Sequence, residues 1–313
     1  MAAKRKSKTF GKFYISLFSI LLCLMICFEA VTVEYFSEQL YHYDVRKDLS
    51  VYFTNADEVI MAIRKCLQRH DWHIIVSFNS HSDNMKDIDD IIRELMDYAV
   101  AETDNPTEGD YIRYQYGGYD LNYTQKTDRD IYYYSVEIIP NYYTTPEQEE
   151  KVSEKISEIL DSFHFTKNTS DYEKFRTIYS YIYNNVNYDK VHKNHTNNHL
   201  KTTAYSALFY KTAVCQGYCV LLYRMLREVG IDTRIITGMA LYETGEEFHS
   251  WNIVMLDGMY YNVDITWDKQ SENNDYYLKC DDDFKSHKRD SQFSTEEFYL
   301  QYPMSKKNYF FEG

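Results

Sequence analysis

Glycine and proline are scarce, with 10 glycines and 4 prolines among 313 residues, and no glycine-rich phosphate-binding loop occurs. The chain therefore lacks the usual sequence signature of a nucleotide-binding site. A calcium loop of the Asp-x-Asp-x-Asp-Gly type is also missing, so we expect no dependence on calcium. None of the six cysteines forms a Cys-x-x-Cys pair, the spacing that zinc sites use. We expect neither a metal nor a cofactor.

Basic residues are outnumbered, with 34 Lys and Arg against 48 Asp and Glu and a formal charge of −14. Five of the basic residues fall within residues 1–12, which hold no acid. The remainder carries 29 basic and 48 acidic residues, a formal charge of −19. A surface this acidic repels phosphate backbones, so we expect no nucleic-acid partner.

The apolar stretch Phe13–Val33 has 21 residues, interrupted by Glu29. A helix of about 17–25 apolar residues can span a bilayer. The basic tail 1–12 should stay in the cytoplasm, which predicts a single-pass anchor at 13–33, a linker at 34–50 and an extracytoplasmic remainder. A cleaved signal peptide is the alternative, although Phe28 spoils a small-x-small cleavage site at Ala30. Both interpretations export the same protein.

Residues 51–165 are predicted to form a small α+β domain. Apolar periodicity and turn residues indicate helices at 55–69, 87–100 and 146–160 and strands at 73–78, 111–123 and 131–139. Pro146 stands where a helix favours proline, in the first turn. No group of side chains in this region suggests chemistry, so a spacer or a substrate-presenting module is the default interpretation.

Cys215 begins the run Cys-Gln-Gly-Tyr-Cys-Val-Leu-Leu-Tyr-Arg-Met-Leu-Arg-Glu-Val-Gly, whose apolar spacing predicts a helix that ends at Gly230. Cys215 would then lie at the helix N-terminus, where the positive end of the helix dipole stabilises a thiolate. Gly217 would allow another backbone or a substrate to approach closely. Helices of residues 171–186 and 204–210 precede this segment.

The other cysteines have plainer interpretations. Cys219, four residues into the predicted helix, is expected to be a buried structural thiol. A bridge between Cys66 and Cys280 is possible, but nothing in their spacing supports it.

Residues 248–268 contain two apolar runs joined by Asp257-Gly258, which predicts a hairpin with a two-residue turn. In that register Asp264 faces Trp251, and His249 and Asp264 become diagonal neighbours on one face of the sheet. A carboxylate there can accept the imidazole N–H and fix its tautomer. Cys215, His249 and Asp264 thus supply a nucleophile, a base and an orienting acid.

These residues resemble those of the transglutaminase-like superfamily. The matching segments are Ala213–Tyr218, Gly230-Ile231, Gly238, His249–Asn252 and Val263–Asp268. The resemblance covers about residues 170–285 and implies an α+β, papain-like catalytic domain over 166–313, with the cysteine helix packed on an antiparallel sheet. It also implies that Cys215 is the nucleophile, His249 the general base and acid, and Asp264 the orienting residue.

The reaction implied by this resemblance passes through a thioester acyl-enzyme formed from an amide of a peptide or protein. The Cys215 backbone N–H is the first candidate donor to the oxyanion, and Gln216, Gly217 and Trp251 are further substrate or oxyanion candidates. Water as acceptor gives hydrolysis, and an amine gives cross-linking. An exported enzyme would meet cell-wall or surface substrates.

Two alternatives remain open. The chain may keep the fold as a catalytically inactive surface or assembly module, although its triad looks complete. A zinc site built from His192, His195 and His199 is the other alternative, but the surrounding Asn and Thr residues indicate a solvated loop without an accompanying Glu.

Overall fold

In the computed structural model of the protein, residues 49, 52–80, 85–190, 199–243 and 245–310 are described. The predicted tail and anchor, most of the linker, and His192 and His195 lie outside these residues, so the predictions for them remain predictions. Within the described part of the chain, no helix combines the length and the apolar character needed to cross a bilayer.

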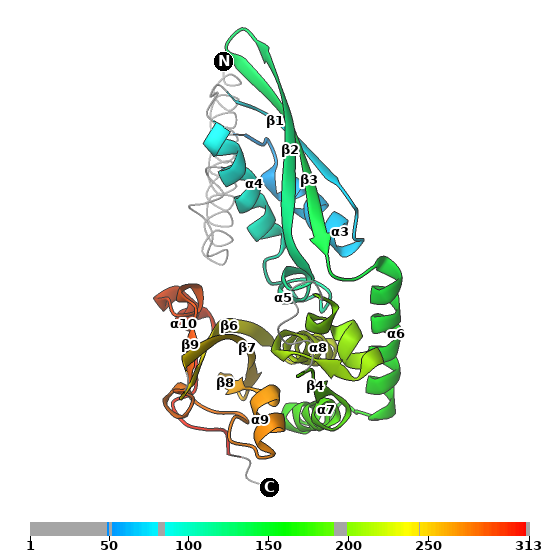
Figure 1. Ribbon diagram of the computed structural model, residues 1–313, viewed down its shortest axis with the longest axis vertical. Helices are drawn as coiled ribbons and strands as arrows, with labels where there is room; N and C mark the ends of the chain where they lie inside the picture. The colour runs from blue at the N-terminus through cyan, green and yellow to red at the C-terminus, as the bar shows by residue number, and fades with distance from the viewer. Residues whose placement is uncertain (1–48, 50–51, 81–84, 191–198, 244, 311–313) are drawn as a thin grey trace, which may run out of the picture.

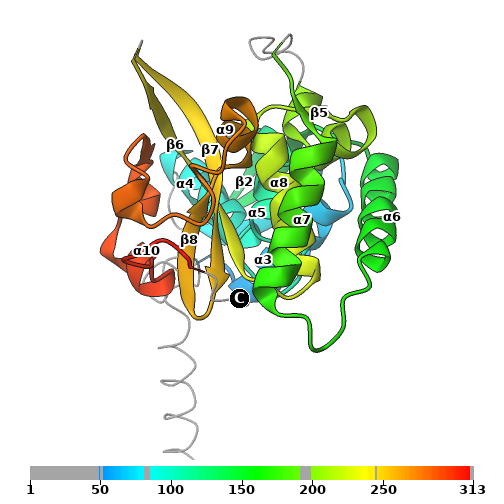
Figure 2. The same cartoon turned by 90° about the horizontal axis from the view of Figure 1, so that it is seen from below.

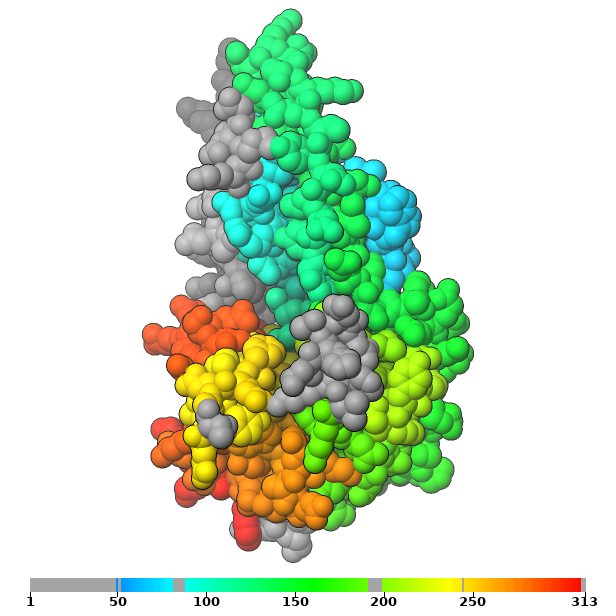
Figure 3. Space-filling view, viewed as in Figure 1, coloured from blue at the N-terminus to red at the C-terminus, as the bar shows by residue number. Residues whose placement is uncertain are grey.

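The first unit is a three-stranded antiparallel sheet, in the order β1-β3-β2, with helices on one face (Figure 1). Its elements are α3 (Ala56–Gln68), β1 (Ile74–Ser80), α4 (Met85–Ala99), α5 (Asp110–Arg113), β2 (Tyr116–Asp128) and β3 (Ile131–Tyr142). Alternate residues of β1 are buried, as expected for a sheet covered on one face. The β2–β3 hairpin extends away from the rest of the molecule (Figure 3).

One predicted element in this unit is wrong. The expected strand at 111–123 begins instead with the short helix α5, and β2 starts only at Tyr116. Gly109 has φ 61°, a left-handed conformation that reverses the chain just before α5. Tyr111 and Ile112 are buried by this turn. A short apolar run does not distinguish a buried helical turn from a strand.

The helix α6 (Pro146–Ser162) begins with a reciprocal cap, in which Thr145 accepts from the Gln148 backbone N–H and Gln148 accepts from the Thr145 N–H. Its buried residues Val152, Ile156 and Ile159 belong to the hydrophobic core of the second unit. The helix therefore packs with the second unit, although it precedes the predicted domain boundary after residue 165, which stays a prediction.

The second unit packs helices against a four-stranded antiparallel sheet, in the order β8-β7-β6-β9. Figure 2 shows α8 between α7 and this sheet. Its elements are α7 (Asp171–Asn185), β4 (Asn187–Tyr188), η1 (His199–Thr202), the π-helical turn η2 (Ser206–Tyr210), β5 (Thr212–Ala213), α8 (Cys215–Glu228), β6 (Thr233–Tyr242), β7 (Gly245–Leu256), β8 (Met259–Val263), α9 (Ile265–Ser271), η3 (Asp281–Asp283), β9 (His287–Arg289), η4 (Ser291–Phe293) and α10 (Glu296–Gln301).

Buried charge joins the two units. Arg234 of β6 places Nε 2.8 Å from Asp110 Oδ2 and 3.3 Å from Glu102 Oε1. The Tyr223 hydroxyl of α8 donates to Glu102 at 2.7 Å. Asp110 is wholly buried, and a buried charge is tolerated only when it is paired. The first unit is thus held against the strand and helix that form the core of the second.

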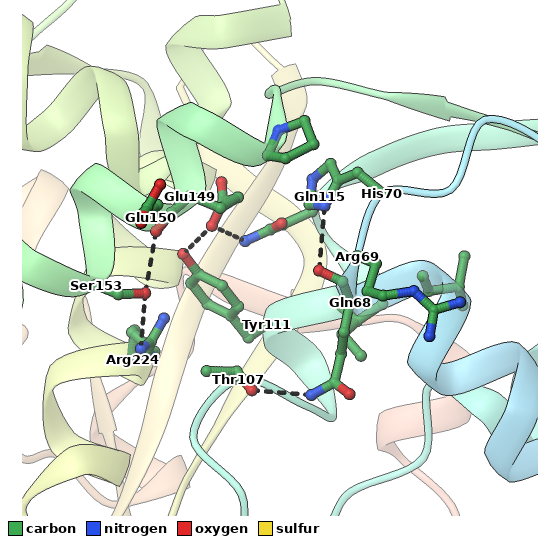
Figure 4. Close-up of a pocket in the computed structure, with 13 residues that line it drawn as sticks. Gln68, Arg69, His70, Thr107, Tyr111, Gln115, Glu149, Glu150, Ser153 and Arg224 are labelled. Atoms are coloured by element: carbon green, nitrogen blue, oxygen red, sulfur yellow. Dashed lines mark hydrogen bonds between the residues drawn. The ribbon is translucent and has the colours of Figure 1, made fainter.

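A polar cavity of about 260 Å³ lies beside this junction (Figure 4). Tyr111 and Gln115 both point to the Glu149 carboxylate of α6, with donor-to-acceptor distances of 2.7 and 3.0 Å. Arg224 of α8 stacks over the Tyr111 ring with its guanidinium carbon 4.9 Å from the ring centre. The lining groups are therefore largely paired with one another.

Candidate active site

Cys215 is the first residue of α8, as predicted. The preceding residue, Val214, provides no side-chain cap. The backbone N–H groups of the first turn of a helix have no acceptor within the helix, so the Cys215 N–H is available to a developing negative charge. Cys215 is half-buried as a residue, whereas Cys219 in the next turn is buried. At the other end of α8, Gly230 has φ 80° and terminates the helix, as predicted.

The hairpin that carries His249 has the predicted register, because β7 and β8 pair Asn252 with Val263 and Leu256 with Met259. Asp257 and Gly258 have φ values of 52° and 79°, as a two-residue turn of type I′ requires. Strand β8 ends at Val263, so Asp264 does not face Trp251 within a ladder. It opens α9 instead.

Asp264 is held by both of its oxygens. Its Oδ1 caps α9, accepting from the Thr266 N–H at 2.9 Å, the Thr266 hydroxyl at 2.5 Å and the Trp267 N–H at 3.1 Å. Its Oδ2 accepts from His249 Nε2 at 2.7 Å. The carboxylate is buried and ionised, and it fixes the His249 tautomer that carries its proton on Nε2.

The remaining ring nitrogen of His249 serves the thiol. Cys215 and His249 interact, and because Nε2 is committed to Asp264, Nδ1 is the ring nitrogen left to face the sulfur. Ser250 also interacts with Cys215 and acts to lower its pKa. The structure thus brings the three predicted residues into one series of thiol, imidazole and carboxylate, with a hydrogen bond between the last two.

The electrostatics of the series favour a thiolate beside an imidazolium. Burial acts to raise the pKa of Cys215, but His249 and Ser250 outweigh burial and lower that pKa below its ordinary value. Burial acts to lower the pKa of His249, but the charge and hydrogen bond of Asp264, with the contact to Cys215, raise it to about 10. Burial acts to raise the pKa of Asp264, yet His249 and His287 hold it far below its ordinary range.

These shifts predict the pH dependence of turnover. Activity should rise as the pH passes through the lowered pKa of Cys215, because the thiolate forms there. It should fall as the pH passes about 10, because His249 then loses the proton that it gives to the leaving group. Turnover measured against pH checks both limbs, and a rising limb at the pKa of an ordinary thiol would contradict the prediction.

The other cysteines are single thiols. Cys66, Cys219 and Cys280 are free, so the bridge between Cys66 and Cys280 does not form in this structure. Cys219 has the structural role expected of it. Its sulfur is buried and lies 3.7 Å from the Ser250 hydroxyl oxygen, and burial raises the pKa of this thiol.

The three further candidates for oxyanion or substrate binding have other partners. The Gln216 side-chain amide donates to the Tyr114 carbonyl at 3.0 Å, and the buried Trp251 indole donates to Asn262 Oδ1 at 3.2 Å. A Cβ on Gly217 would come within 2.9 Å of the Lys201 carbonyl oxygen, so this glycine admits a neighbouring backbone segment. The oxyanion and substrate roles predicted for these three residues stay predictions.

A second histidine lies on the same carboxylate, and the sequence interpretation missed it. His287 of β9 places Nε2 3.0 Å from Asp264 Oδ2. His249, Asp264 and His287 each offer a metal-ligating atom within 4.8 Å of the others. The short imidazole-to-carboxylate distances are those of hydrogen bonds, and a metal here would take over His249 Nε2. The one described histidine of the predicted zinc alternative, His199, stacks on Tyr143 with a ring-centre distance of 4.8 Å.

Comparisons with known proteins match the same part of the chain. Residues 162–265 match the family model of the Transglutaminase-like superfamily. The mouse and human proteins named kyphoscoliosis peptidase are each 30% identical to this chain over 125 residues, which is 37% of this chain and 18% of the relative. This chain therefore spans less than a fifth of the length of these curated relatives.

A solved structure described as that of a TGase also matches, with a TM-score of 0.34 and 18% identity over 47% of this chain and 44% of the other. The resemblance to the transglutaminase-like superfamily is confirmed over the residues that the family model matches. The matched segment contains Cys215, His249 and Asp264 but stops before His287. Residues 162–265 of this chain are therefore similar to the core of the Transglutaminase-like superfamily.

Proposed function

We propose that the protein is a cysteine-nucleophile enzyme that acts on amide bonds of peptides or proteins through a thioester acyl-enzyme. The observation that carries the proposal is the series from Cys215 to His249 to Asp264, with a 2.7 Å contact between imidazole and carboxylate. The opposed shifts in the pKa of Cys215 and of His249 supply a nucleophile and a proton donor together.

In the first half-reaction, the Cys215 thiolate attacks the amide carbonyl carbon, and the carbon–oxygen π electrons move to the oxygen. The position of Cys215 at the start of α8 supports its backbone N–H as a donor to that oxyanion. His249 then gives its proton to the amide nitrogen, the carbon–nitrogen bond breaks, and an amine and a thioester remain. Asp264 stays ionised throughout and stabilises the imidazolium.

In the second half-reaction, water or an amine attacks the thioester while His249 takes its proton. The carbon–sulfur bond breaks and regenerates the thiolate. The name peptidase borne by the two curated relatives supports water as acceptor and a peptide as substrate here. The Trp267 ring lies beside His249, with 5.7 Å between the ring centres. Tyr242 packs on Trp267 in turn, with 5.1 Å between their ring centres.

The deciding experiment incubates the protein with a glutamine-containing peptide, with and without a primary amine, and follows products by mass spectrometry. Peptide fragments indicate peptide-bond hydrolysis, conversion of glutamine to glutamate indicates deamidation, and an amine adduct indicates transfer. The wild type should form one of these products and Cys215→Ala none. No product across a library of peptides, or equal product from Cys215→Ala, would contradict the proposal and favour an inactive module.

We also propose that Phe13–Val33 holds the protein in the cell membrane as a single-pass anchor, with the catalytic core on the extracytoplasmic side. The 21-residue apolar length and the basic flank of residues 1–12 support this arrangement. Protease added to intact cells should then digest the core, and alkaline carbonate should leave the chain in the membrane fraction. A protected core in intact cells would rule out the proposed orientation.

A further inference from the structure

The Asp264 carboxylate receives two imidazoles on one oxygen atom. His249 Nε2 lies 2.7 Å and His287 Nε2 lies 3.0 Å from Asp264 Oδ2. Three donors from Thr266 and Trp267 already occupy Oδ1, so the buried group accepts five hydrogen bonds. His249 is part of the reacting series. His287 is not.

His287 is held in place on every side. Its backbone pairs with Ala240 of β6 at the edge of the sheet. Its ring is buried among four aromatic side chains. The ring-centre distances are 4.0 Å to Phe284, 4.5 Å to Trp267, 5.0 Å to Trp251 and 5.5 Å to Tyr276. A side chain packed this closely has little rotamer freedom, so its Nε2 is a fixed donor.

The second ring nitrogen of His287 has its own partner. The Ser286 hydroxyl lies 3.1 Å from Nδ1 and can donate to it. That arrangement leaves a neutral imidazole with its proton on Nε2, directed at Asp264. Burial acts to lower the pKa of His287, and the charge of His249 lowers it further, although Asp264 opposes both and the net shift is downward. A neutral His287 can stay bonded to Oδ2 while His249 changes charge.

We infer that His287 is a positioning residue, which holds Asp264 Oδ2 in line with His249 Nε2 and so keeps Nδ1 of His249 directed at Cys215. The three donors on Oδ1 hold only one oxygen of the carboxylate. The other oxygen, Oδ2, is held by His249, which takes part in proton transfer, and by His287, which does not. This inference rests on the proposed function, because it assigns His287 to the same reaction.

The test follows alkylation of Cys215 by iodoacetamide in the full chain, measured by mass spectrometry of the Cys215 peptide across a range of pH. Without the His287 donor the carboxylate is less firmly held in line with His249, so the imidazolium that stabilises the Cys215 thiolate is weakened. In His287→Leu the rising limb should therefore move up by about one pH unit. Alkylation at neutral pH should then slow by up to about tenfold, because the thiolate fraction at a given pH falls by at most that factor.

Two further variants separate positioning from packing. His287→Gln keeps an N–H in reach of Oδ2 and should recover most of the lost alkylation rate and the original limb. Phe284→Leu removes the ring packed at 4.0 Å but keeps the donor, so it should lower the melting temperature without moving the limb. On a peptide substrate, His287→Leu should lower kcat and leave KM nearly unchanged, because His287 contacts no substrate.

The outcomes are distinct. Besides the two histidines, the titratable groups that interact with Asp264 are Asp268, Tyr276, Tyr179, Tyr188 and Cys219. They are intact in all three variants, so they cannot produce a difference among them. The inference would be overturned if the rising limb of the alkylation–pH profile stayed in place in His287→Leu. It would also be overturned if Phe284→Leu shifted that limb by an equal amount. Slow alkylation of Cys215 in the wild type would instead contradict the proposed function itself.

Discussion

Replacing Cys215 by serine should abolish turnover, with a loss of roughly 10⁴- to 10⁶-fold. The hydroxyl is nearly isosteric with the thiol, but it is far less acidic, and His249 is set to stabilise an anion that already exists. Cys215 is a half-buried residue at the start of α8, and serine is close to it in size, so little packing is lost. Turnover of the peptide substrate and the melting temperature, measured together, check the prediction.

Cys66 offers a matched control. Cys66 is a free cysteine and a half-buried residue like Cys215, but it lies on α3 of the first unit. Burial and the neighbouring Asp71 raise the pKa of Cys66, the opposite of the shift at Cys215. Cys66→Ser should therefore leave turnover unchanged, and Cys215 should be alkylated much faster than Cys66 near neutral pH. Equal alkylation of the two thiols would contradict a thiolate at Cys215.

Local patterns were enough to predict the parts of the site that depend on local rules. The Asp257-Gly258 turn determined the hairpin register, and that register placed His249 and Asp264 near each other. The apolar spacing after Cys215 predicted α8 and its N-terminal residue. In each of these cases one turn type or one helical period decides the geometry, so the sequence carries the information within a few residues.

Contacts between distant segments were not predictable in this way. The sequence does not show that the Gln216 side chain has a hydrogen-bond partner in the first unit. That partner is the Tyr114 carbonyl, 102 residues earlier in the chain. His287 lies on a strand of only three residues, too short for any periodicity to reveal. The available signal was the aromatic sequence context of His287, with Phe284 and Tyr276 before it. Such a context indicates a buried imidazole, and a buried imidazole needs a polar partner. The sequence did not identify that partner as Asp264.

Asp264→Asn is expected to have the second-largest effect, a loss of about 10⁴-fold in turnover in a protein that still folds. The amide oxygen can still cap α9, accepting from the Thr266 and Trp267 backbone N–H groups as Oδ1 does now. With that oxygen so engaged, the amide NH₂ occupies the place of Oδ2 and faces the N–H groups of both His249 and His287.

Two donors cannot bond to each other, so His249 must move its proton from Nε2 to Nδ1 to accept from the amide. Nδ1 then presents a hydrogen to Cys215 and cannot take the thiol proton. The expected result is a folded protein whose Cys215 alkylates at the rate of an ordinary thiol, with the rising limb shifted to higher pH. Asp268→Asn is the matched control, since Asp268 is equally buried on α9 but bonds Tyr179 and the Tyr276 backbone instead of His249. An unshifted limb in Asp264→Asn would show that the carboxylate does not set the state of the imidazole.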